Sequence, residues 1–353
     1  MSYLRKHIDA MAAYTPGEQP AEGEQVIKLN TNETPYPPSP RVLQVLRQTD
    51  WSILRKYPDP MAGKARRAAA RLWRVPPEQV LCGNGSDELL TLAMRAFVGE
   101  GDRVAWPTPT YSLYAVLAEI QGARAVEVPT EIDFAAPLDA LAEVDARLLL
   151  LCNPNAPTGV WTPVEKVLDL ADRFAGVVVV DEAYADFGPA SVIPAVKDRE
   201  NVVVLRTLSK SYSLAGLRFG YAVGAPDLIA GLAKCKDSYN CDAVSIEVAS
   251  AALEDQHWMR ENVERIRVER TRMADALSAL GFGVTLSEAN FVLAAVPGGD
   301  AAGLYTRLKS RGILIRYWNQ PRLEDKVRIT IGTPEENDAL LAAIADLMGK
   351  ETP

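Results

Sequence analysis

The run Thr207-Leu-Ser-Lys210-Ser-Tyr-Ser-Leu-Ala-Gly-Leu-Arg218-Phe-Gly-Tyr221 decides how this chain is interpreted. It places one amine, that of Lys210, among small hydroxyl side chains, with the guanidinium of Arg218 further along. An amine that forms an imine requires a weakly charged, sheltered setting. A ligand that carries both an aldehyde and a phosphate requires hydroxyls and an arginine near that amine. The run supplies both, but a Ser-Lys pair alone is more typical of a solvated turn, so the interpretation depends on partners elsewhere.

The segments before this run predict a mostly parallel sheet. Unbroken apolar stretches are typical of strands that are covered on both faces. Such stretches occur at residues 103–106, 147–151, 177–180 and 202–205. A helical pattern at residues 88–97 precedes the first of them, and another at residues 164–174 lies between the second and the third. This alternation predicts a large α/β domain over residues 45–240.

The rest of the chain predicts a second, smaller α+β domain. The 353 residues are more than one hydrophobic core usually holds. Apolar residues recur at helical spacing from Met259 to Leu280, and short strand patterns follow at residues 290–294, 312–315 and 327–331. We expect residues 241–353 to form this domain, together with part of an N-terminal arm at residues 1–44.

Composition excludes several classes of function. The formal net charge of −8 disfavours nucleic acid or an anionic membrane as a partner. Four cysteines without CxxC spacing are typical of reduced thiols in a cytoplasmic protein. The two histidines, His7 and His257, are too few for a histidine-rich metal site, and we expect no metal. No apolar run approaches the length of a membrane span, and the N-terminus lacks a secretory pattern.

A carboxylate and a phenol follow the apolar stretch at residues 177–180. Asp181 and Tyr184 would lie at the carboxyl end of a parallel strand, where such sheets bind ligands. An aspartate there can pair with a protonated ring nitrogen and keep the ring electron-poor. A helix cap or a metal-binding carboxylate remains an alternative for Asp181.

A glycine-rich turn at residues 83–88 precedes a helical pattern. Glycines allow the N–H groups of Gly85, Ser86 and Asp87 to turn toward an anion at the start of the helix. We expect Ser86 or Asp87 to be the N-cap. Tyr111 follows another strand and could stack on an aromatic ligand, although ordinary packing is the alternative.

Together these segments resemble the aminotransferases of the aspartate aminotransferase type, which depend on pyridoxal 5'-phosphate (PLP). The resemblance implies that Lys210 holds the PLP aldehyde as an imine and moves the substrate α-proton. It assigns Asp181 to the ring nitrogen, Tyr184 to the ring hydroxyl and Tyr111 to the ring face. The phosphate ligands that it implies are Gly85, Ser86, Asp87, Thr207, Ser209 and Arg218.

The turn at residues 152–159 departs from the pattern of this family. It resembles the family's NPxxPTG turn, but many relatives carry an asparagine immediately before the second proline, where this chain has Ala156. That asparagine binds the ring hydroxyl in relatives. Either Asn155 or Asn153 takes its place, with Asn155 the favoured candidate, or Tyr184 acts with less help.

The segment Arg55-Lys-Tyr57-Pro-Asp59 resembles another element of the family. In relatives its tyrosine reaches the cofactor phosphate of the neighbouring subunit. The resemblance therefore implies a homodimer in which Tyr57 serves the partner's site.

Further segments resemble the histidinol-phosphate aminotransferase family. They are the run from Leu29 to Pro35, the run around Lys210, and Arg328-Ile-Thr-Ile-Gly-Thr-Pro-Glu-Glu-Asn337. This resemblance implies transamination of L-histidinol phosphate with 2-oxoglutarate, giving imidazole-acetol phosphate and L-glutamate. It places Tyr14 and Asn32 at the substrate.

One site of this kind must hold a phosphate in one half-reaction and a carboxylate in the other. Guanidinium groups bind either anion. We expect Arg328 to hold the α-carboxylate of glutamate and to share the substrate phosphate with Arg316.

Two other enzymes of this fold remain alternatives: a threonine-phosphate decarboxylase and an aromatic amino-acid aminotransferase. An aminotransferase-fused DNA-binding regulator is disfavoured, because the motifs of this chain begin at Tyr14. The segment at residues 238–241 is a candidate for the pocket lining, but its residue types suggest no particular role.

Overall fold

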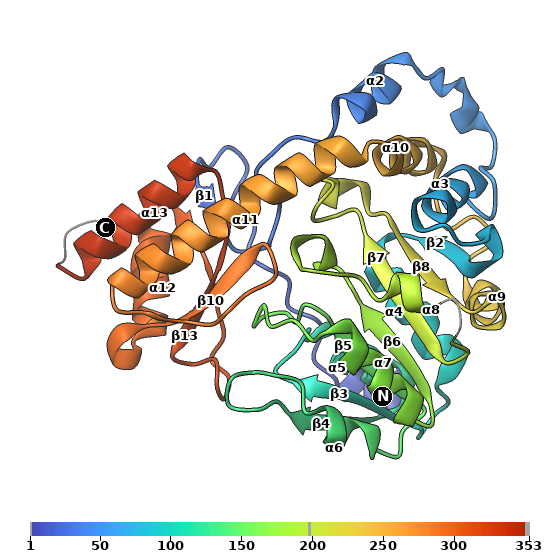
Figure 1. Ribbon diagram of the computed structural model, residues 1–353, viewed down its shortest axis with the longest axis horizontal. Coiled ribbons are helices and arrows are strands. Elements are labelled where there is room, and N and C mark those ends of the chain that lie inside the picture. The colour runs from blue at the N-terminus through green and yellow to red at the C-terminus, as the bar shows by residue number, and fades with distance from the viewer. Residues whose placement is uncertain (1, 197–198, 350–353) are drawn as a thin grey trace.

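The computed structural model describes residues 2–196 and 199–349, which form a large and a smaller body around separate sheets (Figure 1). The long helix α11 (Gln256–Ala279) runs from one body to the other.

The large sheet is mostly parallel, as the sequence predicted. In the described residues its order is β2 (Val80–Gly83), β8 (Gly220–Gly224), β7 (Val202–Thr207), β6 (Val177–Asp181), β5 (Leu148–Cys152), β3 (Arg103–Thr108) and β4 (Arg124–Pro129). Only β8 runs antiparallel to its neighbours β2 and β7. The side chains of β5 and β7 are all buried, because helices cover the sheet on both faces (Figure 1).

The covering elements come mainly from the middle of the chain. The helices are α2 (Pro40–Gln48), α3 (Gly63–Trp73), α4 (Gly85–Phe97), α5 (Leu113–Gln121), α6 (Leu138–Ala142), α7 (Val164–Arg173), α8 (Ile193–Val196), α9 (Pro226–Cys235) and α10 (Ala243–Glu254). Short 3-10 helices lie at η1 (Trp51–Arg55), η2 (Pro77–Gln79), η3 (Ala185–Phe187) and η4 (Ala215–Leu217).

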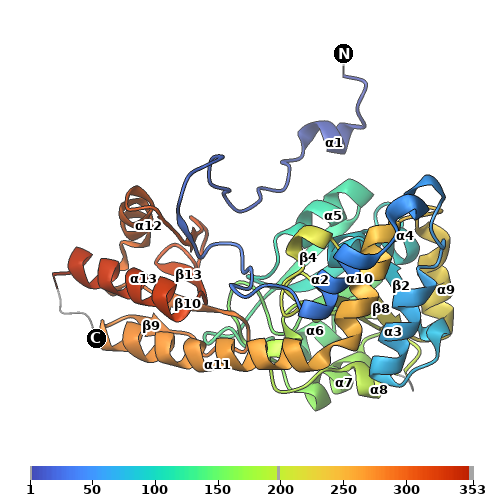
Figure 2. The ribbon, with the colours of Figure 1, turned by 90° about the horizontal axis from the view of Figure 1, so that it is seen from above.

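The smaller body has an antiparallel sheet of β12 (Arg316–Tyr317), β13 (Lys326–Thr330), β10 (Phe291–Ala295) and β9 (Gly283–Val284). Its other elements are η5 (Pro297–Gly299), α12 (Ala301–Ser310) and α13 (Pro334–Leu347). A short parallel pair joins β1 (Ile27–Lys28) to β11 (Ile313–Leu314), so the N-terminal segment contributes to this body. Figure 2 shows α1 (Lys6–Ala10) at the edge of the molecule, where it contacts α5.

The expected α/β class with a smaller α+β part is therefore confirmed. The boundaries at residues 44/45 and 240/241 stay predictions. Helix α10, which follows the second boundary, packs on α2 and α3 of the large body. None of the described helices is both long and apolar enough to cross a membrane.

The start of α4 differs from the prediction that Ser86 or Asp87 caps it. The helix begins at Gly85, and Asn84 is the N-cap residue without a side-chain capping bond. Gly85 has a left-handed backbone (φ +77°), which lets the chain turn into the helix before Ser86. Ser86 and Asp87 therefore lie in the first helical turn, next to the cavity described below.

Candidate active site

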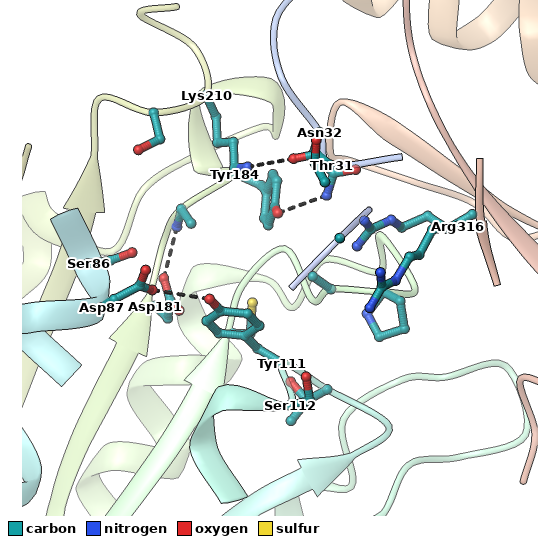
Figure 3. A pocket seen from close by; sticks show the side chains of 18 of the residues that line it. Thr31, Asn32, Ser86, Asp87, Tyr111, Ser112, Asp181, Tyr184, Lys210 and Arg316 are labelled. Carbon is teal, nitrogen blue, oxygen red and sulfur yellow. Dashed lines mark hydrogen bonds between the residues drawn. The ribbon is translucent and has the colours of Figure 1, made fainter. Parts of the chain in front are cut away.

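A cavity of about 210 Å³ lies where the carboxyl ends of β5, β6 and β7 face the smaller body (Figure 3). Three parts of the chain line it. The large body supplies Ser86, Asp87, Tyr111, Asp181, Tyr184, Thr207, Ser209, Lys210 and Arg218; the smaller body supplies Arg316, Trp318 and Arg328; the N-terminal segment supplies Tyr14 and Asn32. The structure thus brings together most of the site residues that the sequence predicted.

The Lys210 amine has an environment that favours its neutral form. Its Nζ donates to the Thr31 carbonyl at 3.0 Å (Figure 3). Burial, and then the positive charge of Arg328, lower the pKa of Lys210 to about 8. About a quarter of such amines are unprotonated at pH 7.5, against about one in a thousand at the ordinary lysine pKa. The amine is therefore available as a nucleophile and a base near neutral pH.

Asp181 ends β6 with its carboxylate in the cavity, and only 2% of the residue is exposed. The Tyr114 hydroxyl donates to Oδ2 at 3.0 Å, and the backbone N–H of Ala183 donates to Oδ1 at 3.2 Å. Burial raises the pKa of Asp181 to about 6, and the bond from Tyr114 opposes that rise. The carboxylate is thus ionised at neutral pH, and a cationic ligand atom would stabilise it further.

A cradle suited to a phosphate lies at one end of the cavity, between α4 and the run around Lys210. Arg218 donates to Ser209 Oγ at 3.2 Å and to Asp87 Oδ2 at 3.0 Å. Thr207 Oγ1 donates to Ser209 Oγ at 2.9 Å. A Cβ on Gly85 would lie 2.9 Å from the Arg218 guanidinium, so a larger residue here would displace the end of this side chain.

The side chain of Asp87 has a task apart from the phosphate contact that we expect of its backbone N–H. Its carboxylate accepts from Arg218 and, through Oδ1 at 3.1 Å, from the Tyr111 hydroxyl. Its side chain therefore orients the guanidinium and the aromatic ring, which leaves only its backbone N–H for an anion. Tyr14 meets the Tyr111 ring edge-on, with 6.1 Å between the ring centroids.

Two arginines form the other end of the cavity. Arg328 is 9% exposed, and its Nη2 donates to the Asn30 carbonyl at 2.8 Å. Its Nε is buried without a partner, which is unusual for a charged donor. Burial lowers the pKa of Arg328 to about 10, and the charge of Arg316 adds to this effect. An anionic ligand beside the two arginines would relieve the repulsion between them.

Arg316 is held less tightly. Its guanidinium donates to the carbonyls of Pro16 and Thr15 at 3.3 and 3.4 Å. Both guanidiniums lie over the Trp318 ring, Arg316 at 5.2 Å and Arg328 at 5.0 Å. Trp318 was not predicted from the sequence, because its role depends on two arginines that only the fold places around it.

The structure gives the side chain of Asn155, the favoured replacement for the missing asparagine, other partners, and its assignment to the ring hydroxyl stays a prediction. Asn155 does not line the cavity. Its amide is already occupied, since Oδ1 accepts from Thr110 at 2.6 Å and Nδ2 donates to Pro109 and Thr158. Asn153 is likewise bonded to the backbone of Thr162. The residues of this turn that line the cavity are Cys152, Ala156 and Pro157, and the side chain of Ala156 cannot form a hydrogen bond.

Tyr57 lies outside this cavity, and 81% of it is exposed. Its ring stacks on that of Tyr239, with 4.5 Å between the centroids. Tyr239 belongs to the segment for which the sequence suggested no role. An exposed tyrosine pair agrees with a site on a neighbouring subunit, which stays a prediction.

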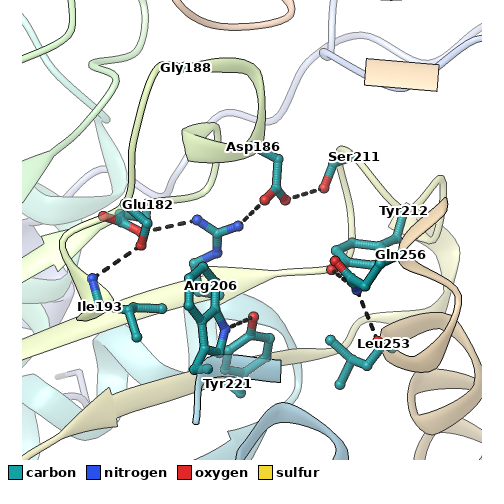
Figure 4. A network of polar contacts seen from close by, with 12 residues as sticks. Glu182, Asp186, Gly188, Ile193, Arg206, Ser211, Tyr212, Tyr221, Leu253 and Gln256 are labelled. Carbon is teal, nitrogen blue, oxygen red and sulfur yellow. Dashed lines mark hydrogen bonds and ion pairs between the residues drawn. The ribbon is translucent and has the colours of Figure 1, made fainter. Parts of the chain in front are cut away.

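A buried ion network behind the cavity was also missed (Figure 4). Arg206, on β7, forms ion pairs with Glu182 at 3.0 Å and with Asp186. Asp186 also accepts from the Ser211 hydroxyl, next to Lys210. The network therefore ties the segment of Asp181 and Tyr184 to the segment of Lys210. No local sequence pattern predicts this network, because the carboxylates that pair with Arg206 are brought to its strand only by the tertiary fold.

Comparison with known proteins agrees with this geometry. Residues 24–344 match the model of the family described as aminotransferase class I and II. The chain belongs to the class I and II aminotransferases. Histidinol-phosphate aminotransferase 1 of Trichormus variabilis is 46% identical over 347 residues, which cover 98% of this chain and 99% of that protein.

Solved structures of aminotransferases and their relatives share the fold. The histidinol-phosphate aminotransferase of Sinorhizobium meliloti, in complex with pyridoxal-5'-phosphate, superposes with a TM-score of 0.90 at 29% identity and covers 99% of this chain and 98% of its own. The L-threonine-O-3-phosphate decarboxylase of Porphyromonas gingivalis superposes with a TM-score of 0.81 at 25% identity, over 92% of this chain and 100% of its own.

Proposed function

We propose that this aminotransferase uses PLP to transfer an amino group between L-histidinol phosphate and 2-oxoglutarate. The observation that carries the proposal is one cavity with the Lys210 amine and Asp181 on one side and two guanidiniums on the other. The 46% identity to a histidinol-phosphate aminotransferase over almost the whole chain supports this choice of substrate.

The donor set fits PLP. Hydroxyls and a guanidinium suit its phosphate, the carboxylate of Asp181 suits its ring nitrogen, and the phenol of Tyr184 suits its ring hydroxyl. The missing Cβ at Gly85 leaves the Arg218 guanidinium in its observed position. When bound, PLP supplies an electrophilic carbon and an electron-accepting ring.

The residues of the chain then have distinct tasks. Lys210 holds the cofactor aldehyde through Nζ and, when that nitrogen is free, takes the proton from the substrate α-carbon. Its lowered pKa lets the amine accept and return that proton near neutral pH. Asp181 keeps the ring nitrogen protonated, and Ser86, Thr207, Ser209 and Arg218 hold the phosphate group.

The arginine end binds the anionic part of each substrate. We propose that Arg328 holds the α-carboxylate of glutamate and that it shares the phosphate of histidinol phosphate with Arg316. The presence of both guanidiniums in the lining of one cavity supports this assignment. Tyr14 lines the cavity on the same side as Thr15 and Pro16, which contact Arg316, and we place Tyr14 at the substrate side chain.

The test is a paired assay on the purified protein loaded with PLP. L-Histidinol phosphate and 2-oxoglutarate should together give glutamate and imidazole-acetol phosphate in equal amounts, without carbon dioxide. Release of carbon dioxide from threonine phosphate without a keto-acid requirement would instead identify a decarboxylase. Phenylalanine turnover equal to that of histidinol phosphate would identify an aromatic amino-acid aminotransferase.

The proposal includes a cytoplasmic homodimer. The exposed Tyr57–Tyr239 pair supports a role for Tyr57 in a second subunit. Mixing Lys210→Ala chains with Tyr57→Ala chains tests it, because each mixed dimer would regain one intact site. If the mixture is no more active than its components, Tyr57 does not serve the partner.

A further inference from the structure

The segment of residues 30–34, here called the strap, crosses the cavity between the two bodies. Its central residue, Asn32, is 1% exposed and has a left-handed backbone with φ +58°. Asparagine adopts this conformation more readily than most residues, but still at some cost. The central residue of the strap is therefore held in this conformation by its surroundings.

The smaller body fixes Asn32 at several atoms. The Asn32 N–H donates to Thr330 Oγ1 at 3.0 Å, and that hydroxyl donates to Asn32 Oδ1 at 2.9 Å. The Asn290 amide donates to the Asn32 carbonyl at 3.0 Å. Thr330 and Asn290 are 1% and 0% exposed. Because the threonine hydroxyl has one proton and gives it to Oδ1, the amide of Asn32 points its NH2 group the other way.

That NH2 group points at Tyr184. Asn32 Nδ2 donates to the Tyr184 hydroxyl oxygen at 2.9 Å (Figure 3). The oxygen is thereby an acceptor, so the phenol proton must go to another partner. Among the described residues no protein acceptor for that proton is seen, and Tyr184 lines the cavity. The phenol can therefore donate into the cavity.

We propose that Thr330 and Asn32 are positioning residues that aim the Tyr184 proton at the ring oxygen of the bound cofactor. This inference rests on the proposed function and deepens it. The family resemblance implied a substrate role for Asn32, whereas its side chain is occupied by Tyr184 and Thr330. The position where relatives carry an asparagine is here the methyl group of Ala156, which cannot compete for the ring oxygen.

The arrangement also connects the two ends of the site. Thr330 lies on β13 two residues after Arg328, and Arg328 donates to Asn30 of the strap. The strap also accepts from the Lys210 amine through Thr31. Strand β13, which carries Arg328, and the phenol of Tyr184 are thus joined through Thr330 and Asn32.

Isosteric substitutions separate positioning from simple packing. Asn32→Asp keeps the shape of the side chain and the tolerance for the left-handed backbone. Its carboxylate can only accept hydrogen bonds, so the Tyr184 hydroxyl should donate to it instead of into the cavity. Thr330→Val removes the hydroxyl that orients the amide, and Thr330→Ser restores it. Tyr184→Phe is the reference for complete loss of the donor. The other ionisable groups near the phenol, namely Lys210, Arg328, Asp181 and Cys152, are unchanged.

The measurement is the pH midpoint of the visible absorption change of the PLP-loaded protein, with the PLP dissociation constant as a second readout. A donor to the ring oxygen stabilises its deprotonated form, so loss of the donor should raise the midpoint. We expect Tyr184→Phe and Asn32→Asp to raise it by about one pH unit, Thr330→Val by about half as much, and Thr330→Ser not at all.

A matched control is Asn337→Asp, which disturbs another fully buried asparagine, bonded to Glu269 and Gly332 away from the cavity. It should reduce stability without moving the midpoint. If Tyr184→Phe moves the midpoint and neither Asn32→Asp nor Thr330→Val does, the inference is wrong while the proposed function stands. Should one of the two variants fail to fold, the other decides. If the unaltered protein gives no visible band with PLP, the proposed function fails first.

Discussion

Arg206 offers the sharpest test of how the fold holds the site together. Its side chain is 3% exposed, that of Glu182 1% and that of Asp186 16%, so water screens these ion pairs very little. The guanidinium also lies 5.2 Å from the centre of the Trp73 ring. Replacing it in Arg206→Met would leave two carboxylates beside an apolar side chain.

The expected loss is large because the remaining charges lack a counterion. Removing one partner of a buried ion pair costs about 3–5 kcal/mol of unfolding free energy. The control is Arg199→Met, which breaks the more exposed ion pair with Asp172. Such surface pairs contribute up to about 1 kcal/mol. We therefore expect the two variants to differ by at least about 2 kcal/mol in urea denaturation.

The difference should depend on pH in a defined direction. Burial already raises the pKa of Glu182, and the charge of Arg206 opposes that rise. Without Arg206 the folded-state pKa rises further above the unfolded value. Stability from such a group is present at low pH and is lost as the pH rises through the folded-state pKa. The deficit of Arg206→Met should therefore be larger at pH 8 than at pH 5, and Glu182→Gln added to it should recover part of the loss.

Urea denaturation at both pH values, followed by circular dichroism, measures these differences. Equal losses in Arg206→Met and Arg199→Met at both pH values would refute the reasoning. They would mean that the buried network contributes no more than a surface pair.

Three other predictions concern the cavity itself. Gly85→Ala should cost about 1–2 kcal/mol of stability, because position 85 has a left-handed backbone. It should also raise the PLP dissociation constant, measured by fluorescence titration, at least about tenfold, because the new Cβ would lie 2.9 Å from Arg218. The control Gly101→Ala is also left-handed but has open space around it, so it should lose stability and leave the PLP dissociation constant unchanged. Amine labelling of Lys210 in the PLP-free protein, followed by peptide mapping, should show a midpoint near pH 8, and a midpoint near 10 would contradict the buried setting. Arg328→Lys should raise the Michaelis constant for the keto-acid acceptor at least about tenfold, because an ammonium cannot bind a carboxylate through two parallel N–H groups. Unchanged Michaelis constants for both substrates would show that Arg328 does not bind substrate.

The large sheet was predictable because its central strands are unbroken apolar runs. Residues 177–180 and 202–205 had to be covered on both faces, and the structure buries all of them except Val177, which is partly buried. The ends of such strands meet at one edge of the sheet, so Asp181 and the run around Lys210 could be placed together without knowing any contact. The pairing of β1 with β11 involves two residues of each strand and leaves no pattern in the sequence.

The differences between the structure and these expectations had identifiable causes. Asn155 was favoured for its position beside Ala156, yet nearby hydroxyl and carbonyl groups occupy its amide. The start of α4 shifted because Gly85 takes up the left-handed turn. Contacts between distant segments, such as Asn32 with Tyr184 or Arg206 with Glu182, depend on tertiary packing. Residue type gives no sign of them, because buried amides and guanidiniums pair with whatever the fold brings near.

The central claim is that the Lys210 amine holds the cofactor. Its most direct test is borohydride reduction of the PLP-loaded protein, followed by proteolysis and mass spectrometry of the peptides. We expect the pyridoxyl group on the peptide that contains Lys210, and loss of that modification in Lys210→Ala. A pyridoxyl group on another lysine, or an equal yield in Lys210→Ala, would contradict the account.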